Sequence, residues 1–209
     1  MPGPFTAEEK ARITRLLLDT GFRLFTTQGL RKTSLDDLVR PAGIAKSSFY
    51  LFFDSKEALY LELMIGQAAE VKRRVVDQAL LRGTDTRDSL RRFLRATVDE
   101  LATNPLYSRL MTHSEEMEAV TRRLDADRMA RLAHNADNPV TALADFVGQR
   151  HAEGALIDAD PSVVVGVLRA VLLLPLHVEQ LGADLYPRIL DLLIDIVAAG
   201  LTSGKEDVT

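Results

Sequence analysis

Hydroxyl and ammonium groups are concentrated in one stretch of the chain, TSLDDLVRPAGIAKSSFYLFFDSKEAL, residues 33–59. These groups donate hydrogen bonds and suit anionic oxygens as partners. Hydroxyls and free amides at a helix start bind phosphate oxygens because the helix dipole favours an anion there, and Thr33 and Lys56 stand at two such starts. Short polar side chains can also approach the edges of DNA bases. The candidate DNA-binding residues are Thr33, Lys46, Ser47, Ser48, Tyr50 and Lys56.

The first element that positions this cluster is a short helix starting at Thr33 or Ser34. Either hydroxyl can accept a hydrogen bond from the free amides, with Asp36 or Asp37 as the acidic partner of a capping box. Pro41 limits the helix, because proline lacks an amide hydrogen and disfavours helical geometry in the residue before it. The helix is therefore expected to be short.

A turn and a second short helix follow. Gly43 suits a tight turn, and the next helix fits Lys46 to Phe52. Two short helices joined in this way match a helix-turn-helix whose second helix enters the DNA major groove. Taken singly, lysines and serines at a helix start are more often caps and solvated surface. The residues expected to form the small core between the helices are Leu38, Ile44, Phe49 and Phe53.

The rest of the chain also shows helical periodicity, and no segment alternates with the period of a strand. The sequence therefore predicts an all-α fold of about nine to ten helices. The predicted helices cover residues 8–28, 33 or 34 to 40, 46–52, 54 or 55 to 82, 86–103, 106–118, 121–135, 140–153, 161–180 and 184–201.

Composition excludes some classes of site. The 209 residues contain no cysteine, so a disulfide framework and a thiolate metal site are excluded, and a cytoplasmic location fits best. The amino terminus has no signal-peptide pattern. The most apolar run, residues 163–176, is interrupted by Arg169 and Pro175 and falls short of the roughly 20 residues that span a bilayer. It is expected to be a buried helix, with no role in a membrane.

Charge is distributed unevenly along the chain. Residues 1–56 contain nine Lys or Arg and six Asp or Glu, a balance of +3, whereas the remainder contains 17 and 24, a balance of -7. A basic amino-terminal quarter is expected if that end meets a polyanion. A solvated surface can also acquire such a skew by chance.

The order and spacing of the motif residues resemble the amino-terminal signature of the tetracycline-repressor (TetR) family of bacterial transcriptional regulators over about residues 8 to 60. The residues that carry this resemblance are Phe25, Gly29, Thr33, Ala42, Gly43, Phe49, Tyr50, Phe53, Lys56 and Leu59. The resemblance implies a helix-turn-helix DNA-binding domain, residues 8–54, and a helical ligand-binding and dimerisation domain, residues 55–203. It also implies a transcriptional repressor that binds a double-stranded operator.

The same resemblance assigns roles to the candidate residues. It places Thr33, Tyr50 and Lys56 on the family's usual phosphate contacts. It places Lys46, Ser47 and Ser48 on the recognition helix. The chain departs from the family pattern at Pro41, at Ser47 and at Leu51-Phe52, so the operator sequence does not transfer and Phe52 is expected to contribute packing.

Two apolar segments near the carboxyl end predict a homodimer. Residues 161–182 are apolar on every face, and residues 183–201 carry an apolar stripe. Two such helices make half of a four-helix bundle, which a twofold partner would complete. The alternative is a monomer in which both helices are core. The predicted interface residues are Val167, Val171, Leu174, Leu185, Ile189, Leu193 and Ile196.

Regulation by a small, largely apolar effector is a further expectation from the family resemblance. The alternative for each candidate is an ordinary core residue, an ion-paired arginine or an exposed histidine. The candidate effector-binding residues are Phe93, Met111, His113, Met117, Phe146, Arg169 and His177.

An enzyme and a structural interaction module are the alternatives from other classes. The chain has no Gly-rich phosphate loop, no His-Glu-x-x-His and no Gly-x-Ser-x-Gly. Glu115 and Glu116 are adjacent, which places them about 100° apart on a helix. No catalytic residue, cofactor or metal is therefore expected, and DNA binding distinguishes a regulator from an interaction module.

Overall fold

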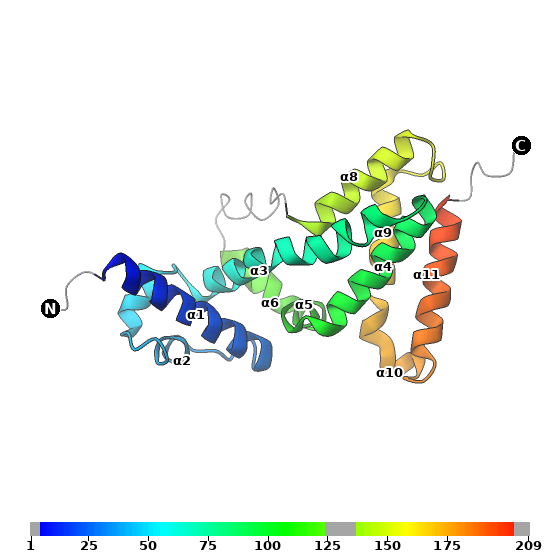
Figure 1. The fold of residues 1–209 in the computed structure, drawn as a ribbon. Helices are drawn as coiled ribbons and strands as arrows, with labels where there is room; N and C mark the ends of the chain where they lie inside the picture. Colours follow the sequence, from blue (N-terminus) through cyan, green and yellow to red (C-terminus); the bar gives the residue numbers. More distant parts are fainter. Residues whose placement is uncertain (1–4, 124–136, 203–209) are drawn as a thin grey trace, which may run out of the picture. The chain divides into compact units, whose positions relative to one another are not determined.

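A computed structural model describes residues 5–123 and 137–202, which belong to two compact units (Figure 1). The first unit combines residues 1–67 with 112–133, and the second combines residues 68–111 with 134–209. Within the described ranges every regular element is a helix, which confirms the predicted all-α class. The functional boundary at residue 54 stays a prediction.

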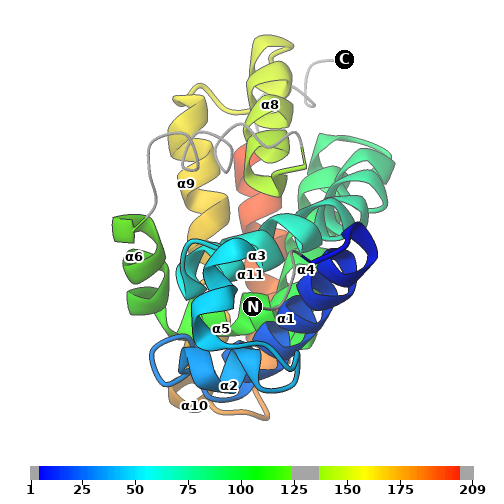
Figure 2. The same ribbon diagram turned by 90° about the vertical axis from the view of Figure 1, so that its left-hand side faces the viewer.

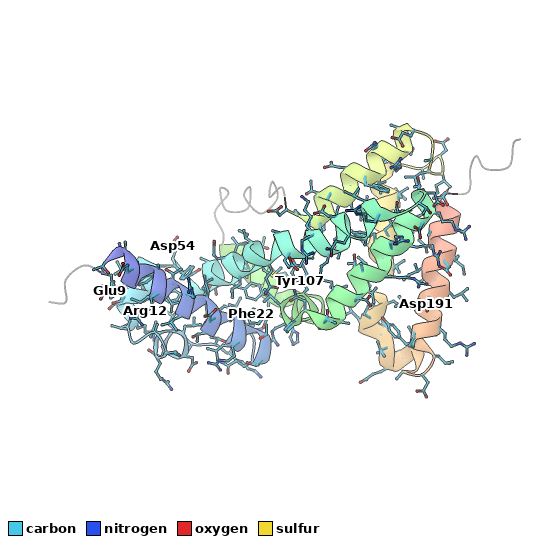
Figure 3. All side chains as sticks on the ribbon, in the orientation of Figure 1. Glu9, Arg12, Phe22, Asp54, Tyr107 and Asp191 are labelled. Atoms are coloured by element: carbon cyan, nitrogen blue, oxygen red, sulfur yellow. The ribbon has the colours of Figure 1, made fainter. Side chains whose placement is uncertain are left out.

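The first unit begins with α1, Ala7–Thr27, close to the predicted range of 8–28. Thr6 and Glu9, the latter labelled in Figure 3, form a capping box that satisfies amides at its amino end. The helix stops before Gly29, whose φ of 91° lies in the left-handed region that glycine adopts without steric cost.

Helix α2, Leu35–Val39, starts at Ser34, whose hydroxyl accepts a hydrogen bond from the Asp37 amide at 3.2 Å. The cap is therefore Ser34 and not Thr33. After Pro41 the chain turns at Gly43, with a φ of 67°. The next element, η1 (Lys46–Leu51), is a 3₁₀-helix.

Helix α3, Lys56–Lys72, runs from the first unit into the second. The single helix predicted to reach residue 82 is interrupted: α3 continues as a π turn, η2 (Arg73–Asp77), and a short 3₁₀ segment, η3 (Leu80–Arg82). Helix α6, Ser114–Arg123, also belongs to the first unit.

The core of the first unit holds α1, α2, η1 and the start of α3 together. The rings of Phe25 and Tyr60 lie 5.5 Å apart, and Gly21 allows Leu59 to approach the α1 backbone closely. Seven of its fully buried large side chains are Ile13, Leu17, Phe25, Leu38, Phe49, Leu59 and Tyr60.

The second unit is a helical bundle in which α4 packs along α11 and α8 packs along α9 (Figures 1 and 2). Ion pairs reinforce the first contact, with Arg91 Nε 2.7 Å from Asp195 and Arg95 3.2 Å from Asp191, which Figure 3 labels. The helices are α4 (Thr86–Thr103), α5 (Pro105–Thr112), α8 (Pro139–Ala152), α9 (Pro161–Val171), η4 (Leu174–His177), α10 (Val178–Leu181) and α11 (Tyr186–Thr202).

Three predicted helices differ from the structure. The helix expected over 106–118 is broken at His113 into α5 and α6. The helix expected over 161–180 ends at Val171, and 3₁₀ and short helical turns follow. Most of the helix predicted over 121–135 lies outside the described residues.

The apolar segment Pro161–Leu181 is long and apolar enough, by length and composition alone, to cross a membrane. The structure divides it at residues 172–173. Only 17% of its most apolar window is buried within the single chain, so the expectation of a helix buried on all sides is wrong for one chain by itself.

Candidate nucleic-acid interface

Helix η1 has six residues, and four of them form two rows along the helix, each with a serine followed by a larger side chain. In a 3₁₀-helix residues three apart eclipse each other, so Ser47 lies in line with Tyr50 and Ser48 in line with Leu51. Tyr50 is 57% exposed and Leu51 is 69% exposed. Phe49 is fully buried and anchors the helix to the core. This arrangement leaves hydroxyl groups and one apolar side chain facing outward together.

Lys46 stands at the start of η1, and its ammonium lies 3.0 Å from the Asp36 carboxylate of α2. Both side chains are more than half exposed, so water weakens the attraction and such a pair contributes about 0–1 kcal/mol. The ammonium can therefore exchange this partner for a phosphate at little cost.

Aromatic contacts surround the carboxyl half of η1 and the residues that follow it. The Phe49 ring lies 5.8 Å from the Tyr50 ring in an edge-to-face arrangement and 6.0 Å from the Phe53 ring. Phe52 is half-buried, with its ring 5.7 Å from the Phe5 ring. The packing role expected for Phe52 is confirmed by this contact.

Thr33 lies inside the first unit. Its side chain is buried, and its hydroxyl donates to the Gly29 carbonyl at 2.7 Å and accepts from Gln28 Nε2 at 3.3 Å. The hydroxyl therefore closes the turn after α1. Its contact with phosphate stays a prediction.

Lys56 points back toward the same turn. Its Nζ donates to the carbonyl oxygens of Leu30 at 2.7 Å and Thr33 at 2.9 Å, with that of Arg31 at 3.4 Å. The structure thus brings Lys46, Ser47, Ser48 and Tyr50 together on η1, whereas the polar groups of Thr33 and Lys56 bind the turn after α1.

Two residues of this region, Leu51 and Glu116, were not among the candidates predicted from the sequence. One signal in the sequence could have identified Leu51: it is an apolar residue that is not among the residues expected to form the small core. Glu116 on α6 is buried and accepts the Leu30 amide at 3.1 Å. No local signal marks it, because the two partners are 86 residues apart.

Comparison with known proteins agrees with this geometry. Residues 17–63 match the family described as bacterial regulatory proteins, tetR family. The mycofactocin biosynthesis transcriptional regulator MftR of Mycobacterium tuberculosis, itself described as putative, is 30% identical over 158 residues, 74% of this chain and 73% of that protein. The chain belongs to the TetR family. Members of this family are DNA-binding transcriptional regulators.

Other curated regulators match over shorter stretches, and the chain spans 17% to 41% of the length of the first three. One is the transcriptional repressor KstR2 of Rhodococcus jostii, 40% identical over 65 residues, 31% of each protein. Among solved structures, AibR in complex with isovaleryl coenzyme A and operator DNA aligns with a TM-score of 0.62 at 16% identity, covering 88% of this chain and 98% of that one. That likeness shows that the two chains share a fold.

The candidate effector residues of this TetR chain fall in different environments. Phe93 and Phe146 are buried in the second unit, and the Arg150 guanidinium covers the Phe146 ring at 5.1 Å. Arg169 and His177 are exposed, and His113 belongs to the first unit. The side chains of Met111 and Met117 lie outside the described part of the structure. The candidates of the second unit thus differ in exposure, with two buried rings and two exposed polar side chains, and their role in binding an effector stays a prediction.

An open pocket of about 480 Å³ lies in the second unit, and none of the candidate residues lines it. Its wall is formed by the start of α4, the end of α8 and the end of α11. The lining residues are Gly83, Thr84, Asp85, Thr86, Arg87, Ser89, Arg150, Gly154, Ala155 and Thr202.

The predicted dimer residues are mostly at the surface of the second unit. Val167, Leu185 and Ile196 are exposed. Leu174, Ile189 and Leu193 are half-buried. Val171 is buried in the core of its own unit, because it faces inward from α9, and is therefore a core residue. Further exposed apolar residues are Val163, Leu173 and Leu192, of which Leu192 belongs to the apolar stripe predicted over residues 183–201.

Proposed function

We propose that this TetR-family regulator is a repressor that binds a roughly palindromic operator as a homodimer, with η1 as its recognition helix. The observation that carries this proposal is the outward face of η1, where Ser47, Ser48, Tyr50 and Leu51 stand on a helix anchored by buried Phe49. Hydroxyls suit base edges and phosphate oxygens, and Lys46 adds a cation beside them.

The anchoring of η1 supports its role in reading sequence. Specific contacts need side chains held in a fixed register on the groove, and Phe49 and Phe53 secure the helix through the core of the first unit. Because η1 is short, one copy can contact few base pairs. A second copy in the neighbouring major groove, about 34–36 Å away, would supply the other half-site.

A dimer is supported by the exposed apolar side chains of the second unit. Those on α9 and the following turn are Val163, Val167 and Leu173, and those on and just before α11 are Leu185, Leu192 and Ile196. Helices α9 and α11 contact each other, so their exposed residues can contribute to one surface (Figure 2). A contiguous apolar surface favours association with a self-complementary copy around a twofold axis.

Control by a small effector is proposed from the family and from the AibR complex. That complex contains both isovaleryl coenzyme A and operator DNA, so a chain of this fold can hold a small molecule and an operator together. A ligand regulates only if it prefers one conformation of the dimer. For this chain we expect a small, largely apolar compound, and binding to chromosomal DNA places the protein in the cytoplasm.

The experiment is selection of genomic DNA fragments by the purified full-length protein, followed by affinity measurements on the enriched site and on scrambled DNA. We expect a palindromic site with half-sites about one helical turn apart. A variant with Ser47→Ala and Tyr50→Ala should lose the preference for that site. Arg87→Ala, which removes an exposed cation of the second unit, is the matched control and should retain it. Enrichment of no sequence by the wild-type protein would contradict the proposal.

A further inference from the structure

We infer that Lys56 and Glu116 are positioning residues that together hold the turn between α1 and α2, residues 29–33, and that Lys56 acts on DNA binding through this turn and not through a phosphate. The inference rests on the proposed DNA-binding function. It distinguishes a charged side chain that binds DNA phosphate from charged side chains that hold the backbone of the turn before α2.

The ammonium of Lys56 is already satisfied by the protein. An ammonium has three hydrogen-bond donors, and three carbonyl oxygens of the turn lie within 3.4 Å of Nζ. The contacts with Leu30 at 2.7 Å and Thr33 at 2.9 Å have the length of strong charge-assisted hydrogen bonds. A phosphate oxygen could bind Nζ only by displacing one of these carbonyls.

Glu116 holds the same turn through its amide. Its carboxylate is buried, and Oε1 accepts the Leu30 N–H at 3.1 Å. The Leu30 residue is therefore held on both polar groups: its carbonyl by a cation from α3 and its amide by an anion from α6. The anion faces an N–H and the cation faces a C=O, on the two peptide groups that flank the Leu30 Cα, so both contacts fix the same residue.

The turn leads directly into the recognition elements. The Thr33 hydroxyl and amide both bond the Gly29 carbonyl, at 2.7 and 3.2 Å, which closes the turn just before the Ser34 cap of α2. Helix α2 in turn packs against η1. Movement of Leu30 would therefore be passed to α2 and from there to η1.

The salt dependence of DNA affinity distinguishes a lysine that holds the protein backbone from a lysine that binds a DNA phosphate. Each phosphate that a protein neutralises contributes a slope of roughly -0.9 in log affinity against log salt. Lys56→Met removes the charge but keeps the length of the side chain, and Lys46→Met is the matched variant on η1. We expect Lys46→Met to make the salt slope less steep, by the contribution of about one phosphate per subunit. Lys56→Met should weaken DNA binding but leave the salt slope at its wild-type value.

Hydrogen exchange in the DNA-free protein supplies the second readout. The Leu30 and Thr33 amides, which donate to Glu116 and to the Gly29 carbonyl, should exchange on the order of tenfold faster in Lys56→Met and in Glu116→Ala, and at the wild-type rate in Lys46→Met. Glu116→Gln keeps an acceptor oxygen and should restore protection. Glu118→Ala, an exposed neighbour on α6, is the control for Glu116 and should change nothing.

The outcomes are distinct. An equal loss of slope in Lys56→Met and Lys46→Met, with unchanged exchange in residues 30–33, would overturn the inference. If the wild-type protein binds no DNA, the proposed function fails, whereas the exchange experiment still decides whether Lys56 and Glu116 hold the turn.

Discussion

In the second unit the Arg74 guanidinium forms a two-point ion pair with the Glu100 carboxylate, with Nε 2.7 Å from Oε2 and Nη2 2.8 Å from Oε1. Arg74 lies in the π turn η2, and Glu100 is buried near the end of α4. Glu100 Oε1 also accepts Asn104 Nδ2 at 2.8 Å, and Asn104 Oδ1 caps α5 at the Leu106 amide. One buried carboxylate therefore joins η2, α4 and α5.

Replacement of Arg74 by Met should destabilise the protein because it leaves the buried Glu100 carboxylate without its cation. The guanidinium is partly exposed, so water moderates the effect, and we expect a loss of about 2 to 3 kcal/mol in the free energy of unfolding. Urea denaturation measures it. Arg73→Met is the control, since Arg73 pairs with the exposed Glu70 carboxylate, and it should leave stability nearly unchanged. Equal losses in both variants would argue against a special role for the Arg74–Glu100 pair.

The same pair predicts a dependence of stability on pH. Hydrogen bonds from Arg74 hold the pKa of Glu100 below its ordinary value of 4.5, so below that pH the unfolded state binds more protons than the folded state. The contribution is complete above the unfolded pKa and is lost as the pH falls through the folded pKa. The stability difference between wild type and Glu100→Gln should therefore shrink as the pH falls below the ordinary value of 4.5 toward the lowered pKa of the folded state. Parallel unfolding free energies over that range would contradict the prediction.

Leu51 should contact a thymine methyl group in the operator. It is the exposed apolar side chain on the outer ridge of η1, and in the major groove the methyl of thymine is the apolar feature that a leucine can read. Replacing that thymine by deoxyuridine removes one methyl group and should weaken wild-type binding about fourfold, from about 0.8 kcal/mol per buried carbon. Leu51→Ala should bind both operators equally. If replacing each thymine in turn by deoxyuridine changed the affinities of wild type and Leu51→Ala in the same way, Leu51 would not contact a thymine methyl group.

The proposed dimer surface can be tested by introducing a charged residue into it. Leu192 is 62% exposed and Ile196 is 57% exposed on α11, and an aspartate at either position would be buried without a partner in a dimer interface. Light scattering at micromolar protein should show two chains for the wild type and one for Leu192→Asp. Val140→Asp, at a similarly exposed apolar position on α8, should remain dimeric. A monomeric wild type would remove the dimer from the proposal.

Cap and turn chemistry explains which elements the sequence predicts well. Helix α4 has the predicted bounds of 86–103, because Asp85 caps its start and Asn104-Pro105 ends it. Helix α1 ends where Gly29 takes a positive φ. The π turn after Lys72 and the break at His113 were missed, since both depend on packing between segments that local propensity does not describe.

The sequence predicts the site in outline and not in its contacts. The spacing of Lys46, Ser47, Ser48 and Tyr50 is sufficient to place them together on one short helix. The neighbouring hydroxyls of Thr33 and Ser34 look alike in the sequence, and only the fold sends one inside and leaves the other as a cap. The partners of Lys56 are 23 to 26 residues away and that of Leu30 is 86 away, so no local pattern could assign them.

In the proposed complex, the 3₁₀ geometry of η1 limits how many base pairs one subunit can read. Six residues rising about 2.0 Å each extend about 12 Å, close to the width of the major groove, and span about four base pairs at 3.4 Å per step. Two such half-sites define about eight base pairs, which occur by chance roughly once in 65,000 positions of random DNA. A bacterial chromosome therefore offers many accidental copies. Discrimination among them must come from the spacing between half-sites and from the bending and groove width of the DNA that separates them.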